Sequence, residues 1–378
     1  MKIVQVCTSL NSFHGGAERF CLNLITALQH EAHDVILVTG DREIQDLDEM
    51  PNQIITIPES KHLIARKLLF DYFNPCSVTK FRRLLNDFNP DLVHFHSFYG
   101  LSSYLVRVAA HFCPVIVTLH DSWVAFYDSS VISLERTFSN TLWKTPLGYF
   151  HRKTNQLFFK DAVLVSPSMW MKQYFEEAGF KTPTYIPNGI LDAGATTSYE
   201  RVLLWVGSLT KFKGLPFVID ILSSHARHMG WRLVIVGDGP YRKVIQEQYP
   251  DVEFVGYSDP SPYYKIASLL VVSSLGYENL PTVILEAMQR GICVVGQDKG
   301  GISELIQHNK TGTLYNSKDS LAGHLSRLMR RPRDIRKLGG NAQIEFYRFY
   351  LWDSCYRKYL NIYRSLINGG QSRNVPIC

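Results

Sequence analysis

The sequence lacks the features that mark disulfide-stabilised, zinc-binding and membrane-spanning proteins. It has only seven cysteines in 378 residues, and they are scattered without a C-x-x-C pair. This usage is typical of reduced thiols in the cytoplasm and argues against a disulfide or metal framework. No apolar run approaches the roughly 18 residues that span a membrane, and the run in MKIVQVCTSL is too short for a secretory signal. We therefore expect a cytoplasmic protein.

Excess charge is scarce too, except near the C-terminus. The net charge is +6, and residues 324–378 alone hold 11 Lys and Arg against 3 Asp and Glu. No nucleic-acid-binding motif accompanies this charge, so nucleic acid is not an expected partner. A composition of 46% hydrophobic and 20% charged residues is that of an ordinary globular protein, and the length favours two domains.

Short apolar runs rich in β-branched residues recur along the chain, with helical patterns between them. Six precede residue 190, namely KIVQVC, DVILVT, QIITI, DLVHFH, PVIVTLH and AVLVSPS, and five follow it, namely VLLWVGS, RLVIVGDG, VEFVG, LLVVSS and ICVVGQ. Continuous apolar runs of this kind predict parallel strands that helices cover on both faces. At residues 188–200, Gly, Thr and Ser replace the alternation of apolar runs and helical patterns, and we predict this segment to be the linker between the two domains. We therefore predict an α/β protein with two doubly wound domains.

The segment YENLPTVILEAM at 277–288 places two acids, Glu278 and Glu286, eight positions apart. Proline suits the first turn of a helix because its missing N–H is one of the unsatisfied donors there. We predict a helix that begins near Pro281, with Asn279 or Leu280 as its cap, and with Glu286 half buried among aliphatic residues. A Glu in the position of Glu278, near the start of a helix, is often only a capping residue. Glu286 differs, because a half-buried carboxylate requires a partner.

Polar motifs follow several predicted strands, at the edge where doubly wound sheets bind their ligands. They are Gly15 and Gly16 in SFHGGAERF, His120 in VTLHDSW, Lys211 and Lys213 in WVGSLTKFKG, and Gly237 and Gly239 in VIVGDGPYRKVI. Glycine permits close backbone approach, and the start of a helix favours an anion. Each motif also has an ordinary structural interpretation as a turn, a solvated loop or a strand-end His, and its residues alone leave both open. None is the G-x-G-x-x-G of dinucleotide-binding proteins.

Taken in order, the motifs resemble those of the retaining family 4 glycosyltransferases of GT-B fold. The segments that carry the resemblance are GGAE, HD, VSPS, IPNGI, VGSLTKFKG, VGDGP, VEFVG and YENLPTVILEAMQRGICVVGQDKGGISELI. It covers residues 1 to about 360 and is strongest from 200 to 315. It implies two Rossmann-like domains facing across a cleft. The acceptor-side domain would be residues 1–190, joined by helices at about 345–378, and the nucleotide-sugar-binding domain would be residues 191–344.

The resemblance also implies roles for these residues. Glu286 would accept hydrogen bonds from the ribose of a nucleotide sugar, and Glu278 would contact the transferred sugar beside the reacting carbon. Lys213 would stabilise the departing diphosphate, which the amides after Glu278 would also hold. His120 would lie near the bond that breaks. The other implied donor-binding residues are Gly15, Gly16, Ser208, Lys211, Gly237, Gly239, Tyr257, Asn279 and Leu280.

Ser208 departs from the family pattern, which commonly has Arg directly after this Gly. Lys211 would have to take the place of that Arg, or the affinity for the donor would be lower. The departure keeps open a sugar-nucleotide-binding but inactive partner subunit. A sugar-nucleotide epimerase of the same fold is a second alternative to a transferase.

The resemblance implies no cofactor and no metal, because positive groups of the protein do the work of a divalent ion and the nucleotide sugar is a substrate. A D-x-D sequence does occur at 46–48, within DREIQDLDEMP. It is typical of a solvated acidic loop, and we do not assign it a metal.

Two basic segments with interleaved apolar residues lie in the first half. Residues 61–83 carry six Lys and Arg against one Asp, and residues 143–160 carry four and no acid. Such segments suit an anionic membrane surface or a lipid diphosphate, and they suit ordinary amphipathic helices equally well. The expected partners are a nucleotide sugar and a glycan or lipid-diphosphate-linked acceptor of polysaccharide or lipopolysaccharide biosynthesis. A peripheral contact with the inner face of the membrane is expected with them.

Overall fold

The structure is a computed structural model, and it describes residues 1–8, 15–40, 53–56, 71–98, 101–125, 146–194 and 197–369. Backbone contacts divide these residues into two units. The N-terminal unit holds the described residues up to Ile186 together with those from Tyr356 onward, and the C-terminal unit holds Pro187–Cys355. The boundaries predicted at 190 and about 345 stay predictions. The acidic sequence at 46–48 and the first part of the basic segment, 61–70, lie outside the described residues.

In the N-terminal unit the described residues form a seven-stranded parallel sheet in the order β3-β2-β1-β4-β5-β6-β7. Its strands are β1 Lys2–Val6, β2 Asp34–Thr39, β3 Gln53–Thr56, β4 Leu92–Phe95, β5 Val115–Thr118, β6 Val163–Ser166 and β7 Thr184–Tyr185. Its helices are α1 Gly16–His30, α3 Pro75–Phe88, α4 Tyr104–Ala109, α6 Pro146–Phe158 and α7 Met169–Glu177, and most of α15 Trp352–Asn368 belongs to it.

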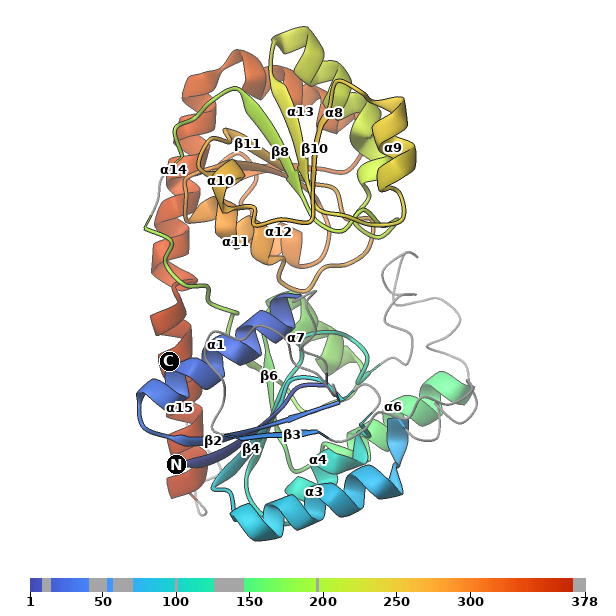
Figure 1. The fold of residues 1–378 in the computed structure, drawn as a ribbon, viewed down its shortest axis with the longest axis vertical. Coiled ribbons are helices and arrows are strands. Elements are labelled where there is room, and N and C mark those ends of the chain that lie inside the picture. The colour runs from blue at the N-terminus through green and yellow to red at the C-terminus, as the bar shows by residue number, and fades with distance from the viewer. Residues whose placement is uncertain are drawn as a thin grey trace. The chain divides into compact units, whose positions relative to one another are not determined.

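Helices cover both faces of this sheet (Figure 1). On β4, Phe95 packs against Phe81 of α3, whereas the neighbouring His94 stacks on Tyr359 of α15. Successive side chains of a strand point to opposite faces, so α3 and α15 lie on opposite sides. Phe20 of α1 contacts Tyr359 too, which places α1 beside α15. The C-terminal helix thus completes the core of the N-terminal unit.

The C-terminal unit has a six-stranded parallel sheet in the order β10-β9-β8-β11-β12-β13. Its strands are β8 Val202–Val206, β9 Arg232–Val236, β10 Glu253–Gly256, β11 Leu269–Val272, β12 Cys293–Gln297 and β13 Gly312–Tyr315. Its helices are α8 Leu215–Met229, α9 Arg242–Gln248, α10 Ser261–Tyr264, α11 Thr282–Met288, α12 Gly301–Leu305, α13 Lys318–Arg330 and α14 Pro332–Phe349.

Two apolar clusters sandwich this second sheet. One contains Leu203 and Trp205 of β8 with residues of α8 and α13, and the other contains Leu204 of β8 with residues of α11 and α14. The alternation along β8 explains why the strand reads as one unbroken apolar run, because each face has its own helical layer. Figure 1 shows α8 and α13 on one side of this sheet and α11 and α12 on the other.

All eleven strands expected from the apolar runs are present and parallel, so the predicted α/β class is confirmed. β7 and β13 were not predicted. β7 has two residues, and GTLY of β13 lacks an apolar run. The predicted cap of the helix in the two-acid segment was wrong. α11 begins at Thr282 after Pro281, whose backbone is extended at ψ 113° and whose carbonyl accepts the Ile284 N–H.

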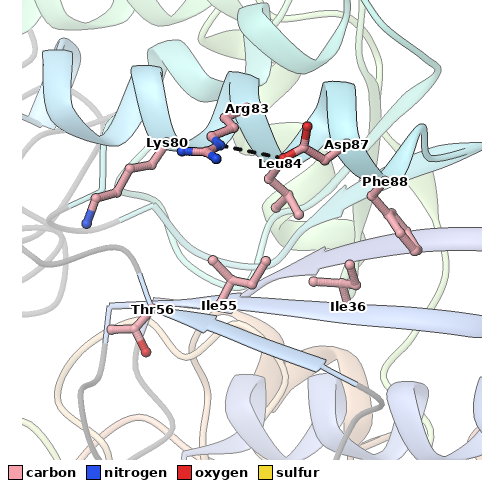
Figure 2. Close-up of a pocket in the computed structure, with 8 residues that line it drawn as sticks. All are labelled: Ile36, Ile55, Thr56, Lys80, Arg83, Leu84, Asp87 and Phe88. Atoms are coloured by element: carbon pink, nitrogen blue, oxygen red, sulfur yellow. Dashed lines mark ion pairs between the residues drawn. The ribbon is translucent and has the colours of Figure 1, made fainter.

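A groove of about 470 Å³ lies in the N-terminal unit between α3 and two strands, β2 and the edge strand β3. Figure 2 shows Ile36 and Ile55 on the strands facing Leu84 on the helix, and Arg83 beside Asp87 at the rim. The Arg83 Nε–Asp87 Oδ2 distance is 3.7 Å, and both side chains are largely exposed. None of the predicted site residues lines this groove.

No helix in the described part of the chain is long and apolar enough to cross a membrane.

The turn after β8 is held against the end of β11 through Gly214. This residue precedes α8 with φ +76°, and a Cβ at this position would collide with the carbonyl oxygen of Ser273. The Ser273 hydroxyl donates to the Lys213 carbonyl at 2.9 Å and accepts the Trp205 indole N–H at 3.0 Å. Glycine is therefore required here by both backbone conformation and space.

We expect Gly214→Ala to lower the free energy of unfolding by about 3 kcal/mol, because the clash adds to the cost of left-handed backbone. Gly230→Ala at the other end of α8 is the matched control, since Gly230 has φ +65° with no atom near the added Cβ. That control is expected to cost about 1 kcal/mol. Urea denaturation followed by Trp fluorescence measures both. Equal losses for the two variants would show that the contact with Ser273 contributes nothing.

Candidate active site

The predicted site residues of the C-terminal unit gather where β8, β9 and β11 end. Lys213 follows β8, Gly237 and Gly239 follow β9, and Glu278 lies in the loop between β11 and α11. These strands are neighbours in the sheet and run parallel, so their carboxyl ends share one edge. The site is thereby built from loops that a rigid sheet positions.

Lys213 and Glu278 form an ion pair. The distance from Lys213 Nζ to Glu278 Oε1 is 2.5 Å, and the side chains are 29% and 13% exposed. The Ser274 hydroxyl donates to the same carboxylate oxygen at 2.7 Å. A short, partly buried pair with a second donor is more strongly held than a solvated surface pair. Both charged residues were predicted site residues, whereas their contact was not predicted.

The loop around Glu278 is fastened by the segment that follows β12. The Gly301 N–H donates to the Glu278 carbonyl at 2.8 Å, and a Cβ on Gly301 would collide with the Asn279 carbonyl. Lys299 donates to the Leu275 carbonyl, and its ammonium lies 4.8 Å from the centre of the Tyr277 ring. These contacts hold the backbone that carries Glu278.

Glu286 lies on α11, half buried, as the sequence predicts. Its Oε2 accepts a hydrogen bond from the Tyr264 hydroxyl at 2.9 Å, and the Arg290 guanidinium lies 5.2 Å from the centre of the Tyr264 ring. The flanking Leu285 and Ala287 are fully buried. The carboxylate among aliphatic residues therefore has a partner within the protein, as burial requires.

Close packing of two loops explains why residues 237 and 239 are glycine. A Cβ on Gly237 would collide with the Gly207 carbonyl oxygen, and one on Gly239 would lie 2.7 Å from the Leu209 carbonyl oxygen. The loops after β8 and β9 thus pack backbone against backbone. Leu209 donates its N–H to the Asp238 carbonyl at 2.8 Å in the same contact. The roles of both glycines toward a nucleoside stay predictions.

The remaining predicted residues of this unit differ in exposure. Ser208 and Lys211 are exposed after β8, and Tyr257 is 62% exposed after β10. Asn279 is half buried, whereas the Leu280 side chain is only 7% exposed and belongs to the core that packs α11. Leu280 can therefore offer a ligand its backbone but little of its side chain.

The N-terminal unit holds the other predicted residues. Gly15 precedes α1 and Gly16 begins it, with the Gly15 carbonyl accepting the Arg19 N–H at 3.1 Å. His120 follows β5, is half buried, and lies 3.1 Å through its Nε2 from His96 Nδ1. Burial lowers the pKa of His120 to about 3, so its imidazole is neutral at pH 7.

Sequence reasoning missed Tyr264, Ser274, Lys299 and His96. Ser274 stands four residues before Glu278 at a strand end, and His96 stands at the end of DLVHFH, so each carried a weak positional signal. Tyr264 and Lys299 are far from their partners in sequence and carried none. Within the described part of the chain, no three His, Cys, Asp or Glu side chains gather to hold a metal ion.

Comparison with known proteins bears on both units. Residues 14–192 match the model of Glycosyltransferase Family 4, and residues 200–331 match that of Glycosyl transferases group 1. An uncharacterized glycosyltransferase of Methanocaldococcus jannaschii is 30% identical over 44% of this chain and 45% of its own length. The match thus spans less than half of that relative.

Two further similarities extend over more of the chain. The lipopolysaccharide 1,2-N-acetylglucosaminetransferase of Salmonella typhimurium is 24% identical over 65% of this chain and 73% of its own length. The structure of Anabaena HepE in complex with UDP superposes with a TM-score of 0.74 at 18% identity, covering 97% of this chain and all of that one. The two family models follow one another along most of the chain, and the fold agrees with them. The chain therefore belongs to the glycosyltransferases of GT-B fold, with a family 4 domain followed by a group 1 domain.

Proposed function

We propose that this chain is a retaining, metal-independent glycosyltransferase. It moves a sugar from a nucleotide sugar to a glycan or lipid-linked glycan acceptor in polysaccharide or lipopolysaccharide biosynthesis. The observation that carries the proposal is the Lys213–Glu278 ion pair at the carboxyl edge of the second sheet. Glu286 lies on α11, the helix that follows Glu278 in the chain. A cation for phosphate and two carboxylates for hydroxyl groups are the chemistry that a nucleotide sugar requires.

Lys213 is the proposed partner of the diphosphate. An ammonium group stabilises the negative charge that grows on the departing diphosphate, and it does so best when the protein already holds it in place. Glu278 and the Ser273–Leu275 loop provide that hold. The diphosphate competes with the Glu278 carboxylate for the same ammonium, so donor binding weakens the ion pair and turns the carboxylate toward the sugar hydroxyls.

Glu286 is the proposed partner of the ribose. A carboxylate presents two acceptor oxygens with about four lone-pair sites, and the Tyr264 hydroxyl donates to Oε2 in the contact described above. Two adjacent ribose hydroxyls are donors that match a fixed carboxylate. The Tyr264 contact orients the group, so the ribose meets an acceptor already in place.

The proposed chemistry proceeds on one face of the sugar. The bond between the anomeric carbon and the diphosphate oxygen breaks, and the acceptor oxygen bonds to the same face of that carbon. The proton of the acceptor hydroxyl passes to the departing phosphate, so atoms and charge balance without a protein nucleophile. Lys213 supplies the positive charge that a divalent ion would supply elsewhere.

An exposed aromatic-basic surface on the N-terminal unit is the proposed membrane contact. It consists of Tyr149 and Phe150 on α6, 56% and 58% exposed, and Phe73 before α3, 49% exposed, with Arg152 and Lys153 beside the Tyr149 ring. The Tyr72 ring contacts Phe150, and this contact joins the residues of α6 to Phe73, the neighbour of Tyr72 in sequence. Aromatic side chains insert at the membrane interface and basic ones meet anionic headgroups. This surface would bring the enzyme to a lipid-linked acceptor.

We expect Glu278→Gln to tighten the binding of a nucleoside diphosphate by up to about fivefold, because Lys213 loses its competing carboxylate. Turnover should fall by about a hundredfold, since the sugar loses its charged partner. Calorimetry measures the first and donor turnover the second. Asp220→Asn removes an exposed acid of α8, paired with Lys318 at 3.8 Å, and controls for net charge.

The same assays on Lys213→Ala locate the phosphate site. Loss of both diphosphate affinity and turnover is expected. If Lys213→Ala changes neither, the diphosphate binds elsewhere and the inactive-partner alternative becomes the better one. Turnover of a nucleotide sugar also separates a transferase from a subunit that binds without reaction, and an intact epimerised donor would identify an epimerase.

We expect Glu286→Ala to weaken the binding of nucleoside diphosphates by about tenfold or more, the scale of a hydrogen bond to a charged group. Inorganic pyrophosphate has no ribose, so its affinity should not change. Calorimetry with both ligands gives the comparison within one protein. An equal loss for pyrophosphate would mean that Glu286 acts on the phosphate site or on folding, not on the ribose.

We expect the double variant Tyr149→Ser, Phe150→Ser to bind phosphatidylglycerol vesicles about tenfold more weakly than the unchanged chain. Phe217→Ser on α8, a side chain 39% exposed in the other unit, is the matched control and should bind unchanged. Vesicle sedimentation at low and high salt measures both variants. Equal binding by all three proteins would remove this surface from the proposal and favour the ordinary amphipathic-helix interpretation.

A further inference from the structure

The groove between α3 and the strands β2 and β3 has apolar walls. Ile36 of β2 and Leu84 of α3 are buried there, and Ile55 of β3 and Phe88 of α3 are half buried. Figure 2 shows the two isoleucines on the sheet opposite Leu84 on the helix. The volume of about 470 Å³ is in the range of sites that bind small molecules. The groove therefore has the size and the lining of a ligand site.

The charged residues of the groove lie at its rim, and the two ends differ. Figure 2 shows Lys80 at the end where Thr56 lies, and Asp87 at the end where Phe88 lies. Arg83 stands between Lys80 and Asp87 along α3 and lines the groove too. One end is therefore cationic, and the other carries an acid that repels an anion.

The two cations can meet one anionic group together. Lys80 and Arg83 are three positions apart on α3, so their side chains are neighbours on the helix surface. Arg83 Nε lies 3.7 Å from Asp87 Oδ2, but both side chains of that ion pair are largely exposed, and such pairs are weak. A phosphate offers oxygens in several directions and binds a guanidinium through two of them. It suits this end of the groove better than the Asp87 carboxylate suits Arg83.

Apolar walls with a cationic end match a ligand that has an apolar chain and an anionic head. Polar groups of a sugar or a peptide backbone would lose water against Ile36, Ile55 and Leu84 without gaining hydrogen bonds, whereas a hydrocarbon chain gains by leaving water. A head bound at Lys80 directs the chain toward Phe88, because only that direction follows the walls.

We propose that this groove binds one chain of a phosphate-headed lipid, with the phosphate on Lys80 and Arg83 and the end of the chain near Phe88. The cationic end is also the end of α3 that leads back to Phe73 of the aromatic-basic surface. A lipid reached through that surface would enter the groove head-side. The inference goes beyond the proposed transfer reaction, because no residue of the proposed active site lines the groove.

The first test is calorimetry of the full chain with dodecyl phosphate, below the concentration at which this probe forms micelles. We expect binding, and we expect dodecyl maltoside, which has the same chain without a charge, to bind about tenfold more weakly. Lys213→Ala removes the proposed phosphate partner of the other unit and should bind dodecyl phosphate unchanged. No binding, equal binding of the two probes, or loss of binding in Lys213→Ala would overturn the proposal.

Two substitutions on one strand test the wall. Ile55→Thr keeps a branched side chain that suits a strand and removes apolar surface from the groove, so dodecyl phosphate should bind about fourfold more weakly. Ile54→Thr is the matched control, since Ile54 is also half buried on β3 but points to the other face of the sheet. Its affinity for the probe should not change. Equal affinities of the two variants would contradict a chain on this wall.

Three substitutions on α3 test the head. Lys80→Ala and Arg83→Ala should each weaken dodecyl phosphate binding by about threefold to fivefold, the scale of an exposed ion pair. Arg82→Ala is the control, because Arg82 is exposed on the same helix and does not line the groove. It removes the same charge and should leave the affinity unchanged. An equal loss in all three variants would mean that net charge, not a site, attracts the probe.

The position of the chain is tested with dodecyl phosphate that carries a photoreactive diazirine on its last carbon. Irradiation should label the peptide that contains Phe88, and labelling only outside the groove would overturn the proposal. Sedimentation shows whether a second copy covers the groove instead. A dimer that excludes the probe and that Ile55→Thr dissociates would replace the lipid by that copy. None of these measurements needs a nucleotide sugar, so they decide the inference whether or not the proposed transfer reaction occurs.

Discussion

The ion pair between Lys213 and Glu278 is the contact on which the proposed donor site of the second unit depends. Two charges on separate loops meet at 2.5 Å, partly withdrawn from water, only because those loops lie at adjacent carboxyl ends of one parallel sheet. The close approach needs a residue without a Cβ at Gly214 and another at Gly301. A partly buried ion pair adds little net stability by itself, because removing its charges from water offsets much of their attraction. Its importance is that the protein holds a cation ready for an anion that is more highly charged than the carboxylate.

The first unit differs in that it buries histidines, among them His94 and His96, in its core. His94 and His96 have almost no exposure, and each has hydrogen-bonded partners for both ring nitrogens. A buried imidazole without partners would cost several kcal/mol, so the row of contacts is a condition of folding. Tyr363 contributes to this row from α15, so the burial of His94 depends on a helix residue 269 positions away in sequence.

Much of the fold was predictable because it depends on local pattern. Parallel strands buried on both faces read as continuous apolar runs, and all eleven such runs are strands. The two strands that were not predicted lack such a run: β7 has two residues, and β13 has the sequence GTLY. The acids at Glu278 and Glu286 were selected from their spacing and context, but the contacts of Lys213 with Glu278 and of Tyr264 with Glu286 join positions 65 and 22 residues apart. No periodic pattern encodes such contacts. Gly237 was selected as a donor-binding residue, which stays a prediction, and its packing against Gly207 explains the glycine locally.

The carboxyl edge of the second sheet is the proposed binding site for a nucleoside diphosphate, with Lys213 on the phosphates and Glu286 on the ribose. A crystal structure of the chain with a nucleoside diphosphate bound measures this most directly. We expect a phosphate oxygen within hydrogen-bonding distance of Lys213 Nζ, a lengthened Lys213–Glu278 contact, and the ribose hydroxyls on Glu286. A nucleotide bound elsewhere, or bound here with the ion pair unchanged and no ribose hydroxyl on Glu286, would contradict this proposal.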